Sequence, residues 1–258
     1  MIHGFSGTRQ IWHPVLERLE ASHDVLAVSL TGHVGGPELG TGAAASVDAL
    51  VEGVERDMDE AGFETAHLVG NSLGGWVALE LARRGRARSV VGLSPAGGWG
   101  AGTRAEARLR RLFTRSHKMG TRISPHLDRL LARPRARRLL LSQMMARGDL
   151  IDPARAAQSV RDAVTCPIYF DLMDAILEQG PPASFDGIDC PVLLAWGTKD
   201  RLLPARRYSQ RLRDLLPQSE WVDLPKLGHV PTSDDPELVA RTIIDFAARA
   251  SQPVPVSA

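Results

Sequence analysis

The sequence predicts an α/β fold in three layers: a doubly wound, mostly parallel sheet with helices on both faces and an inserted helical cap. Two observations carry this prediction. Short apolar runs typical of buried strands alternate with segments of helical periodicity, which is the pattern of a parallel sheet covered by helices. The alternation then stops over residues 100–185, where helical segments follow one another. The 258 residues suffice for one such domain with a sizeable core.

Apolar runs and helix-start residues place the individual elements. Strands are expected over residues 24–30, 66–71, 89–94, 192–196 and 220–223. Core helices are expected from near Trp12, from Ser46 to about Ala61, and from Asp235, where two acidic residues flank a proline as in many first helical turns. The inserted cap reads as helices over residues 103–116, 125–132, 134–147, 153–163 and 167–179.

The most informative segment is the turn Gly70-Asn71-Ser72-Leu73-Gly74, which joins the apolar run 66–71 to a helical segment. A Gly-x-Ser-x-Gly turn between a strand and a helix is a nucleophile elbow, in which a strained backbone holds the serine hydroxyl at the open edge of a sheet. The small neighbours let the helix fold back against the strand. The alternative interpretation is a glycine-rich turn with an inert serine.

Two further residues can activate Ser72. A serine hydroxyl is a weak nucleophile at neutral pH, so it needs a base, and the base needs an orienting acid. Asp200 follows the run 192–196 and His229 follows the run 220–223. Both therefore lie at the carboxyl ends of strands, where open α/β sheets bind ligands. Alone, each would be an ordinary loop residue; with the elbow, we interpret them as the catalytic acid and base.

With these motifs the chain resembles the α/β-hydrolase superfamily. The resemblance runs from His3 to about Arg249, interrupted by residues 100–185, and rests on four segments: His3-Gly4-Phe5-Ser6-Gly7, Gly70-Asn71-Ser72-Leu73-Gly74, Gly197-Thr198-Lys199-Asp200 and Gly228-His229. The order Ser, Asp, His along the chain is that of the superfamily. The resemblance implies that the backbone N–H groups of Phe5 and Leu73 form an oxyanion hole. A donor of this kind is typically worth about 3 kcal/mol in the transition state.

The resemblance also implies a division of the chain. Residues 1–99 and 186–250 would form the hydrolase core, and residues 100–185 would form the cap. The tail 251–258 is rich in proline and lacks periodicity, so we expect it to be disordered.

The start of the chain departs from the superfamily pattern. Members carry a hairpin and a full central strand before the His-Gly turn, whereas only Met1 and Ile2 precede it here. We therefore expect the N-terminal strands to be missing, through a misplaced start codon or a fragment. The sheet would then show a gap, a distortion or two strands closed directly on each other. Each lost hydrogen bond would cost about 1 kcal/mol, so low stability and weak activity are expected.

Composition excludes several classes of function. The formal net charge is +1, which gives no global field for nucleic acid. The cysteines Cys166 and Cys190 lack metal-ligand spacing and are typical of free thiols in a reducing, cytoplasmic compartment. No apolar run approaches the roughly 20 residues of a membrane span. We expect neither a metal nor an organic cofactor, and the sequence leaves the oligomeric state open.

The expected cap is strongly basic. Between Thr103 and Arg147 it carries twelve arginines and one lysine against Glu106 and Asp128. A solvated helical surface explains this simply. Attraction of an anionic substrate, an acidic carrier protein or an anionic lipid surface is the sharper alternative. Candidate lining residues of the cap, which at helical spacing also suit its interior, are Met144, Met145, Tyr169, Phe170 and Met173.

The predicted function is that of a serine hydrolase cleaving a carboxylic ester or a related small acyl compound through an acyl-enzyme. A serine nucleophile argues against the dehalogenase and epoxide-hydrolase branches, which attack with a carboxylate. One alternative is a C–C bond hydrolase of a diketone. Those relatives share the Gly-Asn-Ser-x-Gly elbow, but they usually have a Gly-rich oxyanion turn and an aromatic residue where Val230 follows His229. The other alternative is a ligand-binding receptor with a slow triad.

Overall fold

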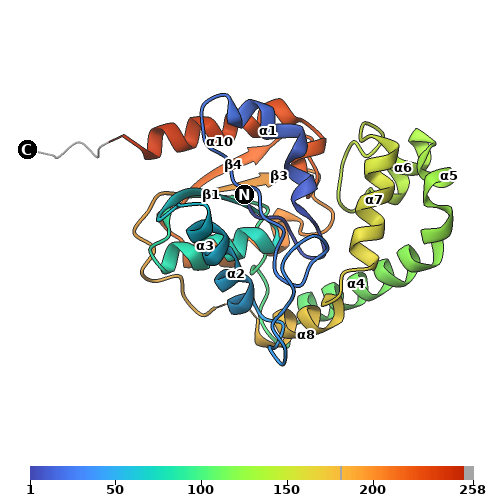
Figure 1. Cartoon of the computed structure of the whole chain (residues 1–258), viewed down its shortest axis with the longest axis horizontal. Coiled ribbons are helices and arrows are strands. Elements are labelled where there is room, and N and C mark those ends of the chain that lie inside the picture. Colours follow the sequence, from blue (N-terminus) through green and yellow to red (C-terminus); the bar gives the residue numbers. More distant parts are fainter. Residues whose placement is uncertain (181, 253–258) are drawn as a thin grey trace, which may run out of the picture.

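A computed structural model describes residues 1–180 and 182–252 and is shown in Figure 1. Within these residues a parallel sheet has the strand order β1-β2-β3-β4. Its strands are β1 (Ala66–Asn71), β2 (Ala87–Leu93), β3 (Val192–Gly197) and β4 (Glu220–Leu224). Because the strands are parallel, their carboxyl ends meet at one edge of the sheet, and loops that follow them can converge there.

Helices cover both faces of this sheet, which confirms the predicted fold class. Strand residues alternate between the faces: Leu68 packs in one apolar cluster and Val69 in the other. The first cluster contains side chains from α2 (Val47–Glu60), α3 (Leu73–Arg83) and α9 (Ala205–Leu215). The second contains side chains from α1 (His13–Glu20), which follows the short helix η1 (Arg9–Trp12), and from α10 (Pro236–Ala250). Figure 1 shows α1 and α10 together, with α2 and α3 across the sheet from them.

The helical insertion lies between β2 and β3, as expected. It comprises α4 (Arg104–Ile123), η2 (Ser124–His126), α5 (Leu127–Leu131), α6 (Pro134–Leu140), α7 (Pro153–Val164) and α8 (Tyr169–Gln179). In Figure 1 the helices α5, α6 and α7 stand to one side of the sheet. The limits of core and cap as domains, and the disorder of the tail, stay predictions; residues 253–258 of that tail lie outside the described part of the chain.

One cap helix is shorter than predicted. The segment 134–147 was expected to be continuous, but α6 ends at Leu140. The backbone N–H groups of Ala146 and Arg147 donate to the Asp234 carboxylate instead of to carbonyls one turn back. A tertiary contact therefore replaces the last helical turns, which local periodicity cannot reveal.

Residues 24–30 do not form the predicted strand. Ile2 makes isolated parallel bridges to Val28 on one side and to Gly70 on the other. Ile2 N donates to Val69 O (2.8 Å), and Val28 N donates to Met1 O (3.1 Å). A strand needs several successive pairs, and Met1 and Ile2 supply too few. Because Ile2 stands between them, the two segments do not close directly on each other.

Candidate active site

Ser72 sits on a strained turn between β1 and α3. Its backbone has φ 56° and ψ −119°, a region that L-residues rarely adopt and that is concentrated at functional sites. A Cβ atom on Gly70 would lie 2.0 Å from Gly74 O, and one on Gly74 would lie 2.2 Å from Ile2 O. Neither position can hold a side chain, which explains the glycines of the motif.

Asp200 and His229 meet as a buried pair at the carboxyl edge of the sheet. His229 Nδ1 donates to Asp200 Oδ2 at 2.7 Å, and both side chains are fully buried. Asp200 Oδ1 accepts from the backbone N–H groups of Leu202 (2.9 Å) and Leu203 (2.8 Å). Burial alone would raise the pKa of Asp200, but His229 and the N–H group of Leu203 outweigh it and hold the pKa below its usual value. The carboxylate therefore stays ionised and fixes the imidazole orientation.

This orientation leaves His229 Nε2 available. The atom is buried and has no hydrogen-bond partner among the described residues, Ser72 included. His229 Nε2 and Ser72 Oγ therefore form no hydrogen bond in the described part of the chain. In unliganded enzymes such bonds are often long and tighten only when substrate binds.

Asn71 joins the serine turn to the histidine loop. Its Nδ2 donates to His229 O at 2.8 Å and to Leu93 O at 3.0 Å. One side chain thus fixes the backbone of His229 relative to the strand that carries Ser72. The sequence placed Asn71 in the elbow motif but did not predict this contact, because no local signal reveals a partner so far along the chain.

The turn His3–Gly7 lies directly against Ser72. A Cβ atom on Gly4 would come within 3.1 Å of Ser72 Cβ and 3.6 Å of Ser72 Oγ. His3 holds the turn, since its Nε2 accepts from Leu30 N (2.9 Å) and its Nδ1 donates to Gly4 O (2.8 Å). Burial lowers the pKa of His3 to about 3, so this imidazole is neutral near pH 7.

The two expected oxyanion donors belong to segments that meet at Ser72. Leu73 is the first residue of α3, and N–H groups in a first helical turn have no intrahelical acceptor. Phe5 N makes no backbone hydrogen bond among the described residues, and the turn is closed instead by Gly7 N donating to Gly4 O. Both groups are therefore free to bind a ligand oxygen.

The cap packs on this turn through aromatic rings. The Phe5 ring lies 5.0 Å from that of Phe113 on α4 and 4.7 Å from that of Tyr169 on α8, measured between centroids. Tyr169 OH donates to Phe113 O at 3.0 Å. Among the other residues expected to line the cap, Met145 and Met173 are buried, whereas Phe170 is 42% exposed.

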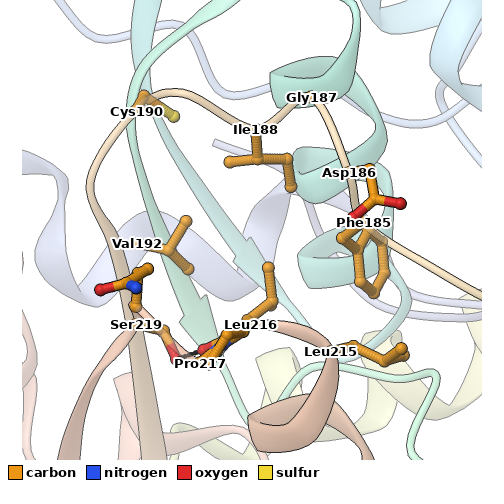
Figure 2. A pocket seen from close by; sticks show the side chains of 11 residues that line it. Phe185, Asp186, Gly187, Ile188, Cys190, Val192, Leu215, Leu216, Pro217 and Ser219 are labelled. Atoms are coloured by element: carbon orange, nitrogen blue, oxygen red, sulfur yellow. Dashed lines mark hydrogen bonds between the residues drawn. The ribbon is translucent and has the colours of Figure 1, made fainter.

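Ser72 does not line either of two cavities in the described part of the chain. The smaller, about 230 Å³ and shown in Figure 2, is lined by Cys190 and Val192 at the start of β3 and by Leu215 and Leu216 at the end of α9. Asp200 follows the other end of β3, so this cavity is at the wrong edge of the sheet for the candidate chemistry. The larger, about 530 Å³, lies between core and cap beside the His3–Gly7 turn and is lined by residues that include Thr8, Met145 and Arg155.

Within residues 1–180 and 182–252, no group of three or more His, Cys, Asp or Glu side chains is placed to hold a metal ion. None of the helices described there combines the length and apolar character needed to cross a membrane.

Comparison with known proteins decides the family. The sequence model described as "Alpha/beta hydrolase family" matches residues 1–242. The chain belongs to the alpha/beta hydrolase family. Epoxide hydrolase EphH of Mycobacterium tuberculosis is 35% identical over 205 residues, which cover 76% of this chain and 92% of that protein.

Solved structures of two hydrolases share the fold of this family member. A thermophilic esterase from Thermogutta terrifontis has a TM-score of 0.72 and 20% identity, covering 97% of this chain and 89% of its own. The 2-hydroxy-6-oxo-6-phenylhexa-2,4-dienoate hydrolase of Rhodococcus has a TM-score of 0.70 and 22% identity, covering 96% and 89%. At these identities the likeness shows the fold alone, so the reaction has to be argued from the site.

Proposed function

We propose that this alpha/beta hydrolase is a serine hydrolase that cleaves a carboxylic ester or a related small acyl compound through an acyl-enzyme on Ser72. One observation carries the proposal: a fully buried Asp200–His229 pair leaves Nε2 free at the sheet edge where the strained turn presents Ser72. A nucleophile, a base and an acid that orients the base are the parts required to activate a serine.

The proposed reaction has two halves, formation of the acyl-enzyme and its hydrolysis, and the same catalytic groups act in both. His229 Nε2 takes the proton from Ser72 Oγ as the oxygen attacks the substrate carbonyl carbon. The N–H groups of Phe5 and Leu73 bind the oxyanion that forms. The imidazolium then protonates the departing alcohol, which leaves an acyl group on Ser72. Water, deprotonated by His229, attacks this ester, and the imidazolium returns the proton to Ser72 Oγ as the acid leaves. Asp200 remains ionised and stabilises the imidazolium in both halves.

Epoxide hydrolysis, suggested by the similarity to EphH, fits this nucleophile poorly. A carboxylate that opens an epoxide forms an ester, which an activated water then cleaves at its carbonyl. A serine hydroxyl that opens an epoxide forms an ether, and an ether has no carbonyl for water to attack. With Ser72 at the elbow, turnover of an epoxide would stop after one covalent event.

C–C bond hydrolysis of a diketone is the second candidate, because the Gly70-Asn71-Ser72 elbow is typical of such enzymes. The surroundings support it less well than ester cleavage. Asn71 Nδ2 already donates to two backbone carbonyls, and the residue after His229 is the buried Val230 instead of an aromatic side chain.

A substrate panel tests the proposal. Wild type and Ser72→Ala would be assayed on p-nitrophenyl acetate, styrene oxide and a vinylogous diketone, with Ser22→Ala, at an exposed serine just after α1, as a control. We expect ester turnover in wild type and in the Ser22 variant, and a loss of several orders of magnitude in Ser72→Ala. Undiminished ester turnover in Ser72→Ala would refute the proposal, diketone turnover alone would favour the C–C reaction, and tight binding without turnover would indicate a receptor.

A further inference from the structure

The loop that carries His229 is bonded to the cap as well as to the core. Val230 N donates to Met144 O at 2.7 Å. Asp234 then accepts three backbone N–H groups: those of Gly228 (2.7 Å) and Ala146 (2.9 Å) on Oδ2, and that of Arg147 (2.7 Å) on Oδ1. The cap segment 144–147 therefore holds Val230 directly and is linked to Gly228 through Asp234.

This contact is close and buried from solvent. A Cβ atom on Gly228 would lie 2.7 Å from Ala146 N and 2.9 Å from Met145 Cα, so the two backbones touch directly. Asp234 is 8% exposed, and Val230 packs in one apolar cluster with Leu131 and Met145 of the cap. Buried hydrogen bonds of this kind hold a geometry more firmly than exposed ones, because water cannot replace them.

The cap side of the contact is itself braced. Arg137, a buried residue of α6, donates to Leu131 O (2.6 Å) and Ala132 O (3.0 Å) at the end of α5, and to Asp149 O (2.9 Å). Its guanidinium thus ties the stretch after α6 to the helices before it. The segment 144–147 is presented to the histidine loop from a fixed frame.

We infer that Asp234 is a positioning residue for His229, and that the cap segment 144–147 forms one wall of the histidine site. Asn71 holds the His229 backbone from the core side, and Asp234 with segment 144–147 holds the same loop from the cap side. This inference rests on the proposed function of His229 as the base. It has a mechanical consequence: the cap cannot lift at segment 144–147 without displacing His229.

Asp234→Asn tests the inference, with Asp235→Asn as the matched control. In Asp234→Asn an amide NH2 replaces one carboxylate oxygen and faces a backbone N–H donor. At least one of the three hydrogen bonds that Asp234 accepts is therefore lost. Asp235 accepts from Leu238 N (3.0 Å) as the N-cap of α10, a role that asparagine fills equally well. For each variant, kcat and KM on p-nitrophenyl butyrate would be measured per active site, counted with a fluorophosphonate probe, together with the pH profile of kcat/KM.

We expect Asp234→Asn to lower kcat per active site by about 10- to 100-fold with little change in KM, because a misplacement of about 1 Å has effects of this size. Its pH profile should also shift relative to that of Asp235→Asn, which should match wild type within about twofold. Should Asp234→Asn not fold, Asp234→Glu keeps both carboxylate oxygens one methylene further out and should show a smaller loss of the same kind.

A folded Asp234 variant with the kcat and pH profile of the control would overturn the inference. So would a loss seen only as fewer active sites, since that is a loss of folded protein and not of geometry. Failure of the proposed function looks different, because wild type itself would then neither react with the fluorophosphonate nor hydrolyse the ester.

Discussion

The cap touches the two halves of the candidate site in chemically different ways. At the His3–Gly7 turn, α4 and α8 place aromatic rings on Phe5, with centroids 4.7 to 5.0 Å apart. At the histidine loop, segment 144–147 makes hydrogen bonds of 2.7 to 2.9 Å to Asp234 and Val230. Apolar packing tolerates small shifts because it is non-directional, whereas short hydrogen bonds fix both distance and angle. The polar contact therefore constrains the position of the cap relative to the core more tightly than the aromatic contact does.

The largest effect should come from the reacting groups themselves, with both cap contacts left intact. His229→Ala should lower kcat by several orders of magnitude, about as much as Ser72→Ala, since the two act as one unit. Asp200→Asn should cost less but still a large factor, through the wrong imidazole tautomer. Full activity of Asp200→Asn in an ester assay would show that another carboxylate orients the histidine.

Forcing the polar contact apart should have the next largest effect. Gly228→Ala places a methyl group 2.7 Å from Ala146 N, so the histidine loop and the cap must separate. We expect kcat to fall by about 100-fold. Gly40→Ala is the matched control, because its new methyl group would make only ordinary contact, at 3.9 Å from Ala43 Cβ. Equal kinetics for the two variants would mean that the polar contact does not control the site.

Truncating the aromatic contact should act on binding and stability more than on kcat. Tyr169→Ala removes a buried ring from Phe5, and such truncations cost about 3–5 kcal/mol of stability. KM should rise several-fold, with kcat within about threefold. Tyr169→Phe keeps the ring and loses only the bond to Phe113 O, worth about 1 kcal/mol. Denaturant titration measures the stability of each variant, and steady-state kinetics measure its kcat and KM. A fall in kcat well beyond threefold in Tyr169→Ala would mean that the aromatic contact controls the site as the polar contact does.

Acid should destabilise the fold around the His3–Gly7 turn, where the rings of the buried residues His3 and His33 lie 5.1 Å apart. Burial lowers the pKa of His3 to about 3 and of His33 to about 4, against about 6.5 in the unfolded chain. As pH falls, the unfolded state binds these protons before the folded state does. The free energy of unfolding therefore has its full value above about pH 6.5 and decreases as pH falls towards 4. The slope should be about 1.4 kcal/mol per pH unit for each histidine. Denaturant titrations between pH 7 and 5 measure this slope, and His33→Gln should lower it by the contribution of one histidine. An unchanged free energy of unfolding across this range contradicts the prediction.

The smallest effect concerns the charge of the cap. If its basic helices attract an anionic substrate, kcat/KM for an acidic ester should fall by a few-fold between low and high salt, while a neutral ester stays nearly constant. Several arginines are already paired, as Arg110 is with Asp174 and Glu178, which reduces the field. The same salt dependence for both esters would favour a simple solvated surface.

Sequence patterns predicted what depends on local rules. The elbow glycines, the strand ends that carry Asp200 and His229, and the place of the insertion all follow from residues near one another in the chain. What could not be predicted depends on contacts between distant segments. The Asn71 side chain donates to the backbone of His229. Asp234 accepts from the backbone N–H groups of residues 146 and 147, where periodicity alone predicts a continuous helix to Arg147. The segment 24–30 has strand composition, but strand formation also needs a partner long enough to pair with it.

The proposed mechanism requires Ser72 to be the covalent nucleophile, and chemical labelling of this residue provides the decisive test. The protein would be inactivated with a fluorophosphonate, digested and mapped by mass spectrometry while residual ester hydrolysis is recorded. We predict one adduct per chain, on the peptide that contains Ser72, with hydrolysis lost in proportion to labelling. An adduct elsewhere, or full hydrolysis by protein that is completely labelled at Ser72, would contradict the account.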